Sequence, residues 1–113
     1  MSVRTQALLW YGQRLSGMVL ALCVLVHLGV IYYAVHGGLT AAEILGRTRG
    51  NLAFGAFYGV FVVACAIHAP IGVAAILDEV SRGRLKQRVP IAGVVGLAVL
   101  VLGMRAVYAV VAP

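Results

Sequence analysis

The sequence contains very little charge. Only 11% of its 113 residues are charged and three are acidic, whereas 63% are hydrophobic. The mean hydropathy is +1.04, and a soluble core of this size would need more polar surface. The net charge of +6 does not indicate nucleic-acid binding, because the basic residues lie at the ends of apolar runs and form no basic stripe. The composition predicts a membrane protein with a single domain over residues 1–113.

Other common signatures are missing too. Cys23 and Cys65 lack C-x-x-C spacing and lie inside apolar runs, so we expect them to be packing residues. We expect no signal peptide or transit peptide, since no small-residue cleavage site follows the N-terminal segment. No nucleophile–base pair, phosphate-binding loop or zinc pattern is present. An enzymatic role would therefore be that of a subunit, without a complete catalytic site of its own.

Three apolar runs are long enough to cross a bilayer as helices, which takes about 20 residues. They cover residues 15–35, 52–77 and 89–111, and only Arg105 interrupts the last run. Between the first two runs, Thr40 and Glu43 have the spacing of a capping box, which predicts a short interfacial helix. Pro70 is expected to kink the second helix. The sequence thus predicts an all-α membrane protein with three transmembrane helices.

The basic residues are unevenly divided between the two ends of these helices. The N-terminal segment and the turn at residues 78–88 carry six Lys or Arg residues, whereas the connection at residues 37–51 carries two. The positive-inside rule then places the N-terminus in the cytoplasm and the C-terminus outside. We expect a multi-pass protein of a bacterial inner (cytoplasmic) membrane.

His68 lies inside the second run, where an ionisable side chain is costly and usually faces protein, a cavity or a cofactor. Ala64 and Gly72 lie one turn before and after it on the same helix face. Such small residues would let a flat group approach the helix while the imidazole binds its metal, as in haem proteins. The pattern alone leaves two roles equally open, a haem ligand and a helix-contact histidine.

His27 is a second histidine at membrane depth. Ser16 precedes it by eleven positions, which is about 20° around a helix, so the two share a face. If the first helix begins at Leu15, the helical rise places His27 and His68 both near mid-membrane. The two histidines could then ligate one iron together, or each could ligate an iron with a histidine of a partner subunit, or only one of them could be a ligand. For His27, a role in helix packing or in contacting a haem propionate is equally open. His36, at the outer interface, is expected to be solvated.

Polar residues near the ends of the spans suggest further contacts. Arg14 and Ser16 lie at the cytoplasmic mouth of the first helix, where they could bind a quinone carbonyl or a haem propionate, and Trp10 is assigned to the same quinone site. The alternatives are a positive-inside anchor for Arg14 and an interfacial aromatic belt for Trp10. Arg105 could contact a haem propionate or snorkel to the outer interface.

Asp78 and Glu79 end the second helix on the cytoplasmic side. They are expected either to pair with the basic turn that follows or to pass protons to a quinone.

Together these residues resemble the cytochrome b membrane-anchor subunits of succinate dehydrogenase and fumarate reductase. Arg14-Leu15-Ser16-Gly17 is similar to the R-x-[ST]-G that opens helix one of the family, and His27-Leu28 to its H-L. His68-x-x-x-Gly72 with the later Asp78-Glu79 is similar to its H-x-x-x-G-[IL]-R and trailing acidic residue. The resemblance covers residues 10–79.

The sequence also departs from the family. Gln13 stands where a histidine is usual, and Ala74 stands where an arginine is usual. The His68-Ala-x-Ile-Gly72 run is also similar to the sister anchor subunit, but Arg14 and Ser16 favour the cytochrome b anchor.

The resemblance implies a haem b, with His68 as an axial ligand completed by a histidine of a second anchor subunit. It places His27 as a ligand in the two-haem branch, and Arg14 and Ser16 near the quinone. Gly72 and Arg105 are also assigned to cofactor binding. The implied partners are a flavoprotein holding FAD, where succinate is oxidised, and an iron–sulfur subunit from which electrons reach quinone. Two further hypotheses are a haem-free structural anchor and a small transport or channel subunit with its histidines in a proton path.

Overall fold

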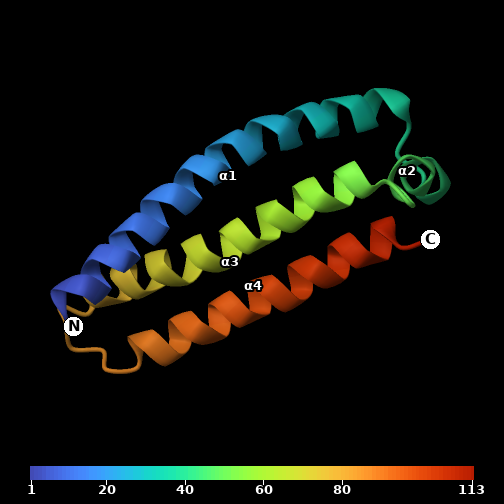
Figure 1. The fold of residues 1–113 in the computed structure, drawn as a ribbon. Coiled ribbons are helices and arrows are strands. Elements are labelled where there is room, and N and C mark those ends of the chain that lie inside the picture. Colours follow the sequence, from blue (N-terminus) through green and yellow to red (C-terminus); the bar gives the residue numbers. More distant parts are fainter.

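The computed structural model describes residues 1–113 as an all-helical chain. Three long helices, α1 (Val3–Gly37), α3 (Leu52–Val80) and α4 (Arg88–Val111), form an elongated bundle, and the short α2 (Ala41–Thr48) crosses one end (Figure 1). The molecule measures 50 × 22 × 22 Å. All three long helices are long and apolar enough to span a membrane, which confirms the three spans predicted from hydropathy.

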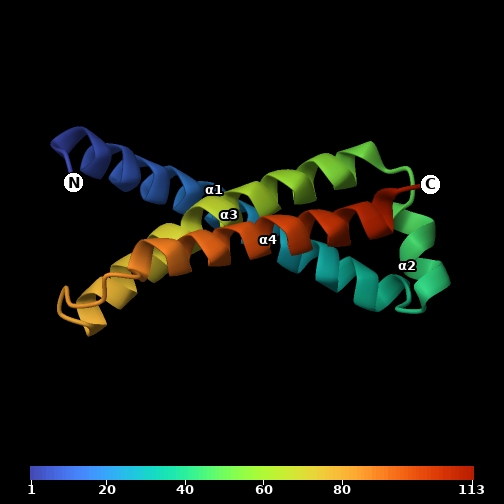
Figure 2. The same ribbon diagram turned by 90° about the horizontal axis from the view of Figure 1, so that it is seen from below.

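The α3 helix is the central element of the bundle. It packs against α1 on one side and α4 on the other, and α1 crosses α3 at an angle so that its two ends diverge from its neighbours (Figure 2). The N-terminus and the α3–α4 turn lie at one end, and α2 and the C-terminus lie at the other (Figure 1). The six basic residues of the N-terminal segment and the α3–α4 turn therefore lie in one half of the bundle, and the two of the α2 connection lie at the opposite end.

A seam of partly or fully buried residues runs along α1. Its members recur at alternating steps of three and four, the repeat that keeps one helix against another in left-handed packing. They are Gln13, Ser16, Leu20, Cys23, His27, Val30 and Ala34. The opposite side of α1 carries exposed apolar side chains such as Leu15, Leu22 and Leu25. The polar groups inside the membrane-spanning part of α1 therefore point at protein, which is the arrangement expected in a bilayer.

The α3–α4 contact is tight at Gly96. A Cβ atom at this position would lie 3.0 Å from Cγ of Pro70 and 3.3 Å from the carbonyl oxygen of Ala66. Pro70 has no N–H, so the Ala66 carbonyl lacks its usual helical donor. The glycine lets the backbone of α4 approach this part of α3 closely.

Side-chain caps hold the end of the bundle that carries α2. The predicted capping box is confirmed, since Thr40 accepts from the backbone N–H of Glu43 while the Glu43 side chain accepts from that of Thr40. Thr48 then donates its hydroxyl to the carbonyl of Val110 at 2.7 Å, and Gly50 donates its N–H to the carbonyl of Val111 at 2.8 Å. The α2 connection is thereby joined to the last turn of α4.

The first helix starts much earlier than its apolar run. Ser2 caps α1 by accepting from the N–H of Thr5 at 3.1 Å, so the helix begins at Val3, twelve residues before Leu15. Hydropathy marks where a helix enters hydrocarbon, not where it begins, and residues 3–14 form helix continuous with the span.

Candidate functional site

His68 lies in the seam between α1 and α3. Its Nδ1 is 3.2 Å from Oγ of Ser16, and the same hydroxyl donates to the carbonyl of Gln13 at 3.1 Å. Ser16 is only 6% exposed. A Cβ on Gly17 would lie 3.4 Å from Cε1 of His68, so this glycine lets the imidazole lie against the backbone of α1. The structure thus brings together two predicted site residues, His68 and Ser16, which the sequence had assigned to different ligands.

The other ring nitrogen of His68 is unoccupied by any group of this chain. Nε2 makes no hydrogen bond, whereas Nδ1 is bonded to Ser16. The one fully buried side-chain polar atom without a partner is Oε1 of Gln13, so Nε2 of the half-buried His68 keeps accessible surface. Nε2 is therefore free to accept a hydrogen bond from a group outside the chain, or to bind a metal.

The helix face that carries Ala64 and Gly72 is covered by α1. Ala64 is 5% exposed, and a Cβ on Gly72 would lie 3.3 Å from Nε2 of Gln13. Within this chain the small residues around His68 therefore allow close helix packing. A flat group bound to His68 would have to approach the Nε2 edge of the ring and not this covered face.

His27 lies farther along the same seam. Its Nδ1 is 2.9 Å from the hydroxyl of Tyr58, and its ring meets those of Tyr58 and Phe61 edge to face, with centroids 5.7 and 5.6 Å apart. The predicted common face of Ser16 and His27 is therefore confirmed. These contacts are those of a packed helix-contact histidine.

The structure does not bring His27 and His68 together. His68 stands opposite Ser16, and His27 stands opposite Tyr58, ten residues before His68, so the two imidazoles are about 15 Å apart along the bundle. Two nitrogen ligands of one metal lie about 4 Å apart. Of the alternatives left open for these histidines, ligation of one iron by both does not fit this distance, because Leu15 lies level with His68 and not with the end of α3. Residues 3–14 of α1 occupy the remaining depth.

The other predicted site residues lie outside the contacts of His68 and His27. The guanidinium of Arg14 lies over the ring of Trp10, 5.5 Å from its centroid, and both side chains are exposed. Arg105 is exposed on α4 and takes part in no ion pair. Asp78 forms an ion pair with Arg88 at 3.5 Å. Pairing with the basic turn is one of the two roles expected for this carboxylate. No three His, Cys, Asp or Glu side chains are grouped as a metal-ion site.

His36 is exposed at the end of α1, as expected from its position. Its Nδ1 bonds to the carbonyl of Tyr32 at 2.9 Å.

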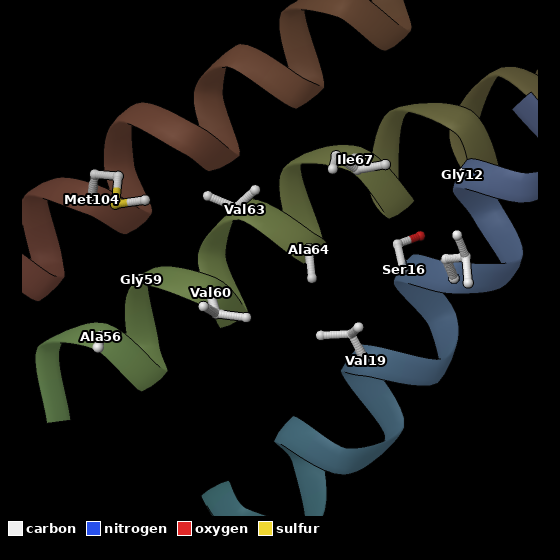
Figure 3. Close-up of a pocket in the computed structure, with 11 residues that line it drawn as sticks. Gly12, Ser16, Val19, Ala56, Gly59, Val60, Val63, Ala64, Ile67 and Met104 are labelled. Carbon is white, nitrogen blue, oxygen red and sulfur yellow. The ribbon is translucent and has the colours of Figure 1, made fainter. Parts of the chain in front are cut away.

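A shallow groove of about 550 Å³ opens beside Ser16. Figure 3 shows Gly12, Ser16 and Val19 of α1 facing Ala64 and Ile67 of α3 across it. Its lining is otherwise apolar, and Ser16 contributes the one hydroxyl.

Sequence reasoning missed Tyr58. A signal was present, because a tyrosine hydroxyl inside a span needs a partner, and Tyr58 lies ten residues before His68 in the same charge-free run. What the sequence could not supply was the register between α1 and α3, which decides that its partner is His27.

The chain is similar in sequence to a curated membrane subunit. The succinate dehydrogenase hydrophobic membrane anchor subunit of Archaeoglobus fulgidus is 30% identical over 82 residues, which cover 73% of this chain and 69% of that subunit. No family model and no solved structure matches the chain.

Proposed function

This chain belongs to the family of succinate dehydrogenase hydrophobic membrane anchor subunits, and we propose that it is a haem-b-binding anchor acting between an iron–sulfur subunit and quinone. The name of the relative describes an anchor and specifies no cytochrome, so the haem assignment depends on His68. The observation that carries it is a histidine within a span whose Nδ1 is bonded to Ser16 while Nε2 has no partner.

The residues present fit one axial haem ligand from this chain. An axial histidine commonly binds through one ring nitrogen while the other donates a hydrogen bond that fixes the ring, and His68 has this arrangement with Ser16. His27 is too distant to be the second ligand of the same iron, so that ligand would come from a second anchor subunit. When bound, haem b would supply a one-electron carrier within the membrane.

Quinone binding is proposed at the end of α1 that carries Trp10 and Arg14. A quinone carbonyl accepts hydrogen bonds, and the exposed guanidinium of Arg14 has donors that no carboxylate occupies. The hydroxyl proton of Ser16 is directed instead to the carbonyl of Gln13. We therefore give the quinone contact to Arg14 and Trp10. Gly72 and Arg105 have no contact here that supports a cofactor role.

The proposed partners follow from the family. A succinate dehydrogenase anchor would bind an iron–sulfur subunit, a flavoprotein subunit holding FAD and a second anchor subunit within the cytoplasmic membrane. The end of the bundle with six basic residues would face the cytoplasm and is where the two soluble subunits would dock.

The test is to purify the complex through a tag on this chain and record its reduced-minus-oxidised absorption spectrum. We expect flavin and iron–sulfur subunits to co-purify with a b-type spectrum, and His68→Ala to lose that spectrum while the subunits stay assembled. His36→Ala is the matched control, because His36 is exposed and bonded only to Tyr32. Unchanged haem content in His68→Ala would remove the ligand assignment.

A haem-free structural anchor is the second candidate function. It is favoured by the close packing of α1 over the face of α3 that carries Ala64 and Gly72. A purified complex with succinate:quinone activity and no b-type spectrum would establish it. A proton path through both histidines has less support, because Leu20 and Cys23 separate Ser16 from His27 along the seam.

A further inference from the structure

We propose that Ser16 is a positioning residue that fixes His68 as the Nδ1–H tautomer and so leaves the lone pair on Nε2 for a metal. The assignment of that metal to haem iron rests on the proposed function, whereas the tautomer itself does not. The hydroxyl would then act on His68, not on the quinone to which the sequence alone assigns it.

Counting protons on the hydroxyl gives the first argument. A serine hydroxyl has one proton and can also accept, and it stands within hydrogen-bond distance of two groups, the carbonyl of Gln13 and Nδ1 of His68. A carbonyl only accepts, so the bond to Gln13 takes the serine proton. The contact with His68 is then a hydrogen bond only if Nδ1 is the donor. With the opposite tautomer, only one of these two hydrogen bonds can form, so the Nδ1–H tautomer is favoured.

The surroundings of the hydroxyl give the second argument. Ser16 is 6% exposed, and Gly17 lets the imidazole lie directly against α1. Water has little access to compete for the bond. Donation from a helical serine to a carbonyl of the preceding turn is also a common arrangement, so Ser16 needs no unusual conformation to hold its proton there.

The chemical consequence concerns the nitrogen at the other side of the ring. With the proton on Nδ1, Nε2 is a lone-pair donor, and it has no partner within the chain. A hydrogen bond from the N–H of a ligating histidine also raises the basicity of the ligand. A more basic ligand stabilises the ferric over the ferrous state, so this hydrogen bond should lower the midpoint potential of a bound haem iron.

The tautomer can be measured without any cofactor. The full chain, produced without haem and labelled with ¹⁵N-histidine, would be studied by long-range ¹H–¹⁵N NMR in lipid nanodiscs. We expect His68 as the Nδ1–H form in the wild type, a shift towards Nε2–H in Ser16→Ala, and recovery in Ser16→Thr. A wild-type His68 in the Nε2–H form, or no change in Ser16→Ala, would overturn the proposal.

The other two histidines are internal controls in the same spectra. The Nδ1 of His36 faces the carbonyl of Tyr32, so it must be the Nδ1–H form whenever that bond exists. His27 should keep its tautomer in Ser16→Ala and respond to Tyr58→Phe, which removes its own partner. A uniform change in all three histidines in Ser16→Ala would show a general loss of folding, and Ser16→Thr would then decide the question.

Measurements on the assembled complex separate this proposal from the proposed function. In Ser16→Ala we expect haem affinity to fall by about 10- to 100-fold, the midpoint potential of the remaining haem to rise, and KM for quinone to stay unchanged. A raised KM with an unchanged potential would place Ser16 at the quinone and overturn its role toward His68. A wild-type complex without haem would refute the proposed function, and the NMR result would still decide the tautomer.

Discussion

At the scale of single residues, two side-chain hydrogen bonds join α1 to α3: one between Ser16 and His68, the other between His27 and Tyr58. Ser16 and His27 lie on one seam because eleven residues make almost three full turns, a property of one helix alone. Their partners, His68 and Tyr58, follow from how far α1 slides along α3. That register is set by packing between the helices and cannot be read from one helix alone. For this reason the common depth predicted for His27 and His68 differs from the structure.

The contact between His27 and Tyr58 leads to a prediction about the histidine whose role the sequence left open. Tyr58→Phe removes the hydroxyl bonded to Nδ1 of His27 and should lower the free energy of unfolding by about 1 kcal/mol. Haem content should not change, since a packing role involves no iron. Unfolding in a dodecyl sulfate titration, followed by circular dichroism, would measure the first effect, and the b-type spectrum the second. Tyr108→Phe is the control, because Tyr108 is 75% exposed; loss of haem in Tyr58→Phe alone would contradict the packing role.

At the scale of helices, local signals predicted ends and caps where they depend on neighbouring residues. The capping box of Thr40 and Glu43 is such a case. The end of α1 is also local in origin, since its C-cap Gly38 has a φ of +110°, which suits glycine. Hydropathy could not predict that α1 starts at Val3. A helix can continue beyond the hydrocarbon region of the membrane, because capping side chains and water satisfy the N–H groups at its end.

The α3–α4 contact predicts a strong difference between two glycines of α4. Gly96→Ala should destabilise the bundle by about 1–3 kcal/mol, because the new methyl group meets Pro70 and a backbone carbonyl that cannot move easily. Gly93→Ala has no atom within 4 Å of the new methyl group and should be neutral or stabilising by up to about 1 kcal/mol, through helix propensity. Comparing unfolding midpoints of the two variants tests the prediction, and equal midpoints would show that this contact is not tight.

The joint between α2 and α4 predicts a local effect. The carbonyl of Val110 is among the last of α4, which have no helical donor, and Thr48 supplies one. Thr48→Val should cost about 1–2 kcal/mol and speed amide hydrogen exchange in the last turn of α4, whereas Thr48→Ser should retain the wild-type protection. Unchanged exchange in Thr48→Val would mean that the hydroxyl does not hold this end.

At the scale of the whole molecule, composition predicted the architecture well because a bilayer imposes it. Without water to pair with backbone groups, three apolar runs of this length can cross a membrane only as helices. The structure has these three helices. It also groups the N-terminus with the α3–α4 turn, and α2 with the C-terminus, at opposite ends (Figure 1), so the two groups of basic residues that determine orientation are physically separated.

The separation of charges predicts how the molecule is inserted. With six basic residues in the half of the bundle that carries the α3–α4 turn and two in the α2 connection, the end with the α3–α4 turn should remain in the cytoplasm, because translocating Lys and Arg is disfavoured. In a background where Cys23 and Cys65 are replaced by alanine, Gln87→Cys and Ala42→Cys each put one exposed thiol at an opposite end. A membrane-impermeant maleimide should label Ala42→Cys in intact cells and Gln87→Cys only after permeabilisation, with the cysteine-free chain unlabelled. The reverse pattern would place the proposed docking end outside the cell, away from any cytoplasmic iron–sulfur partner.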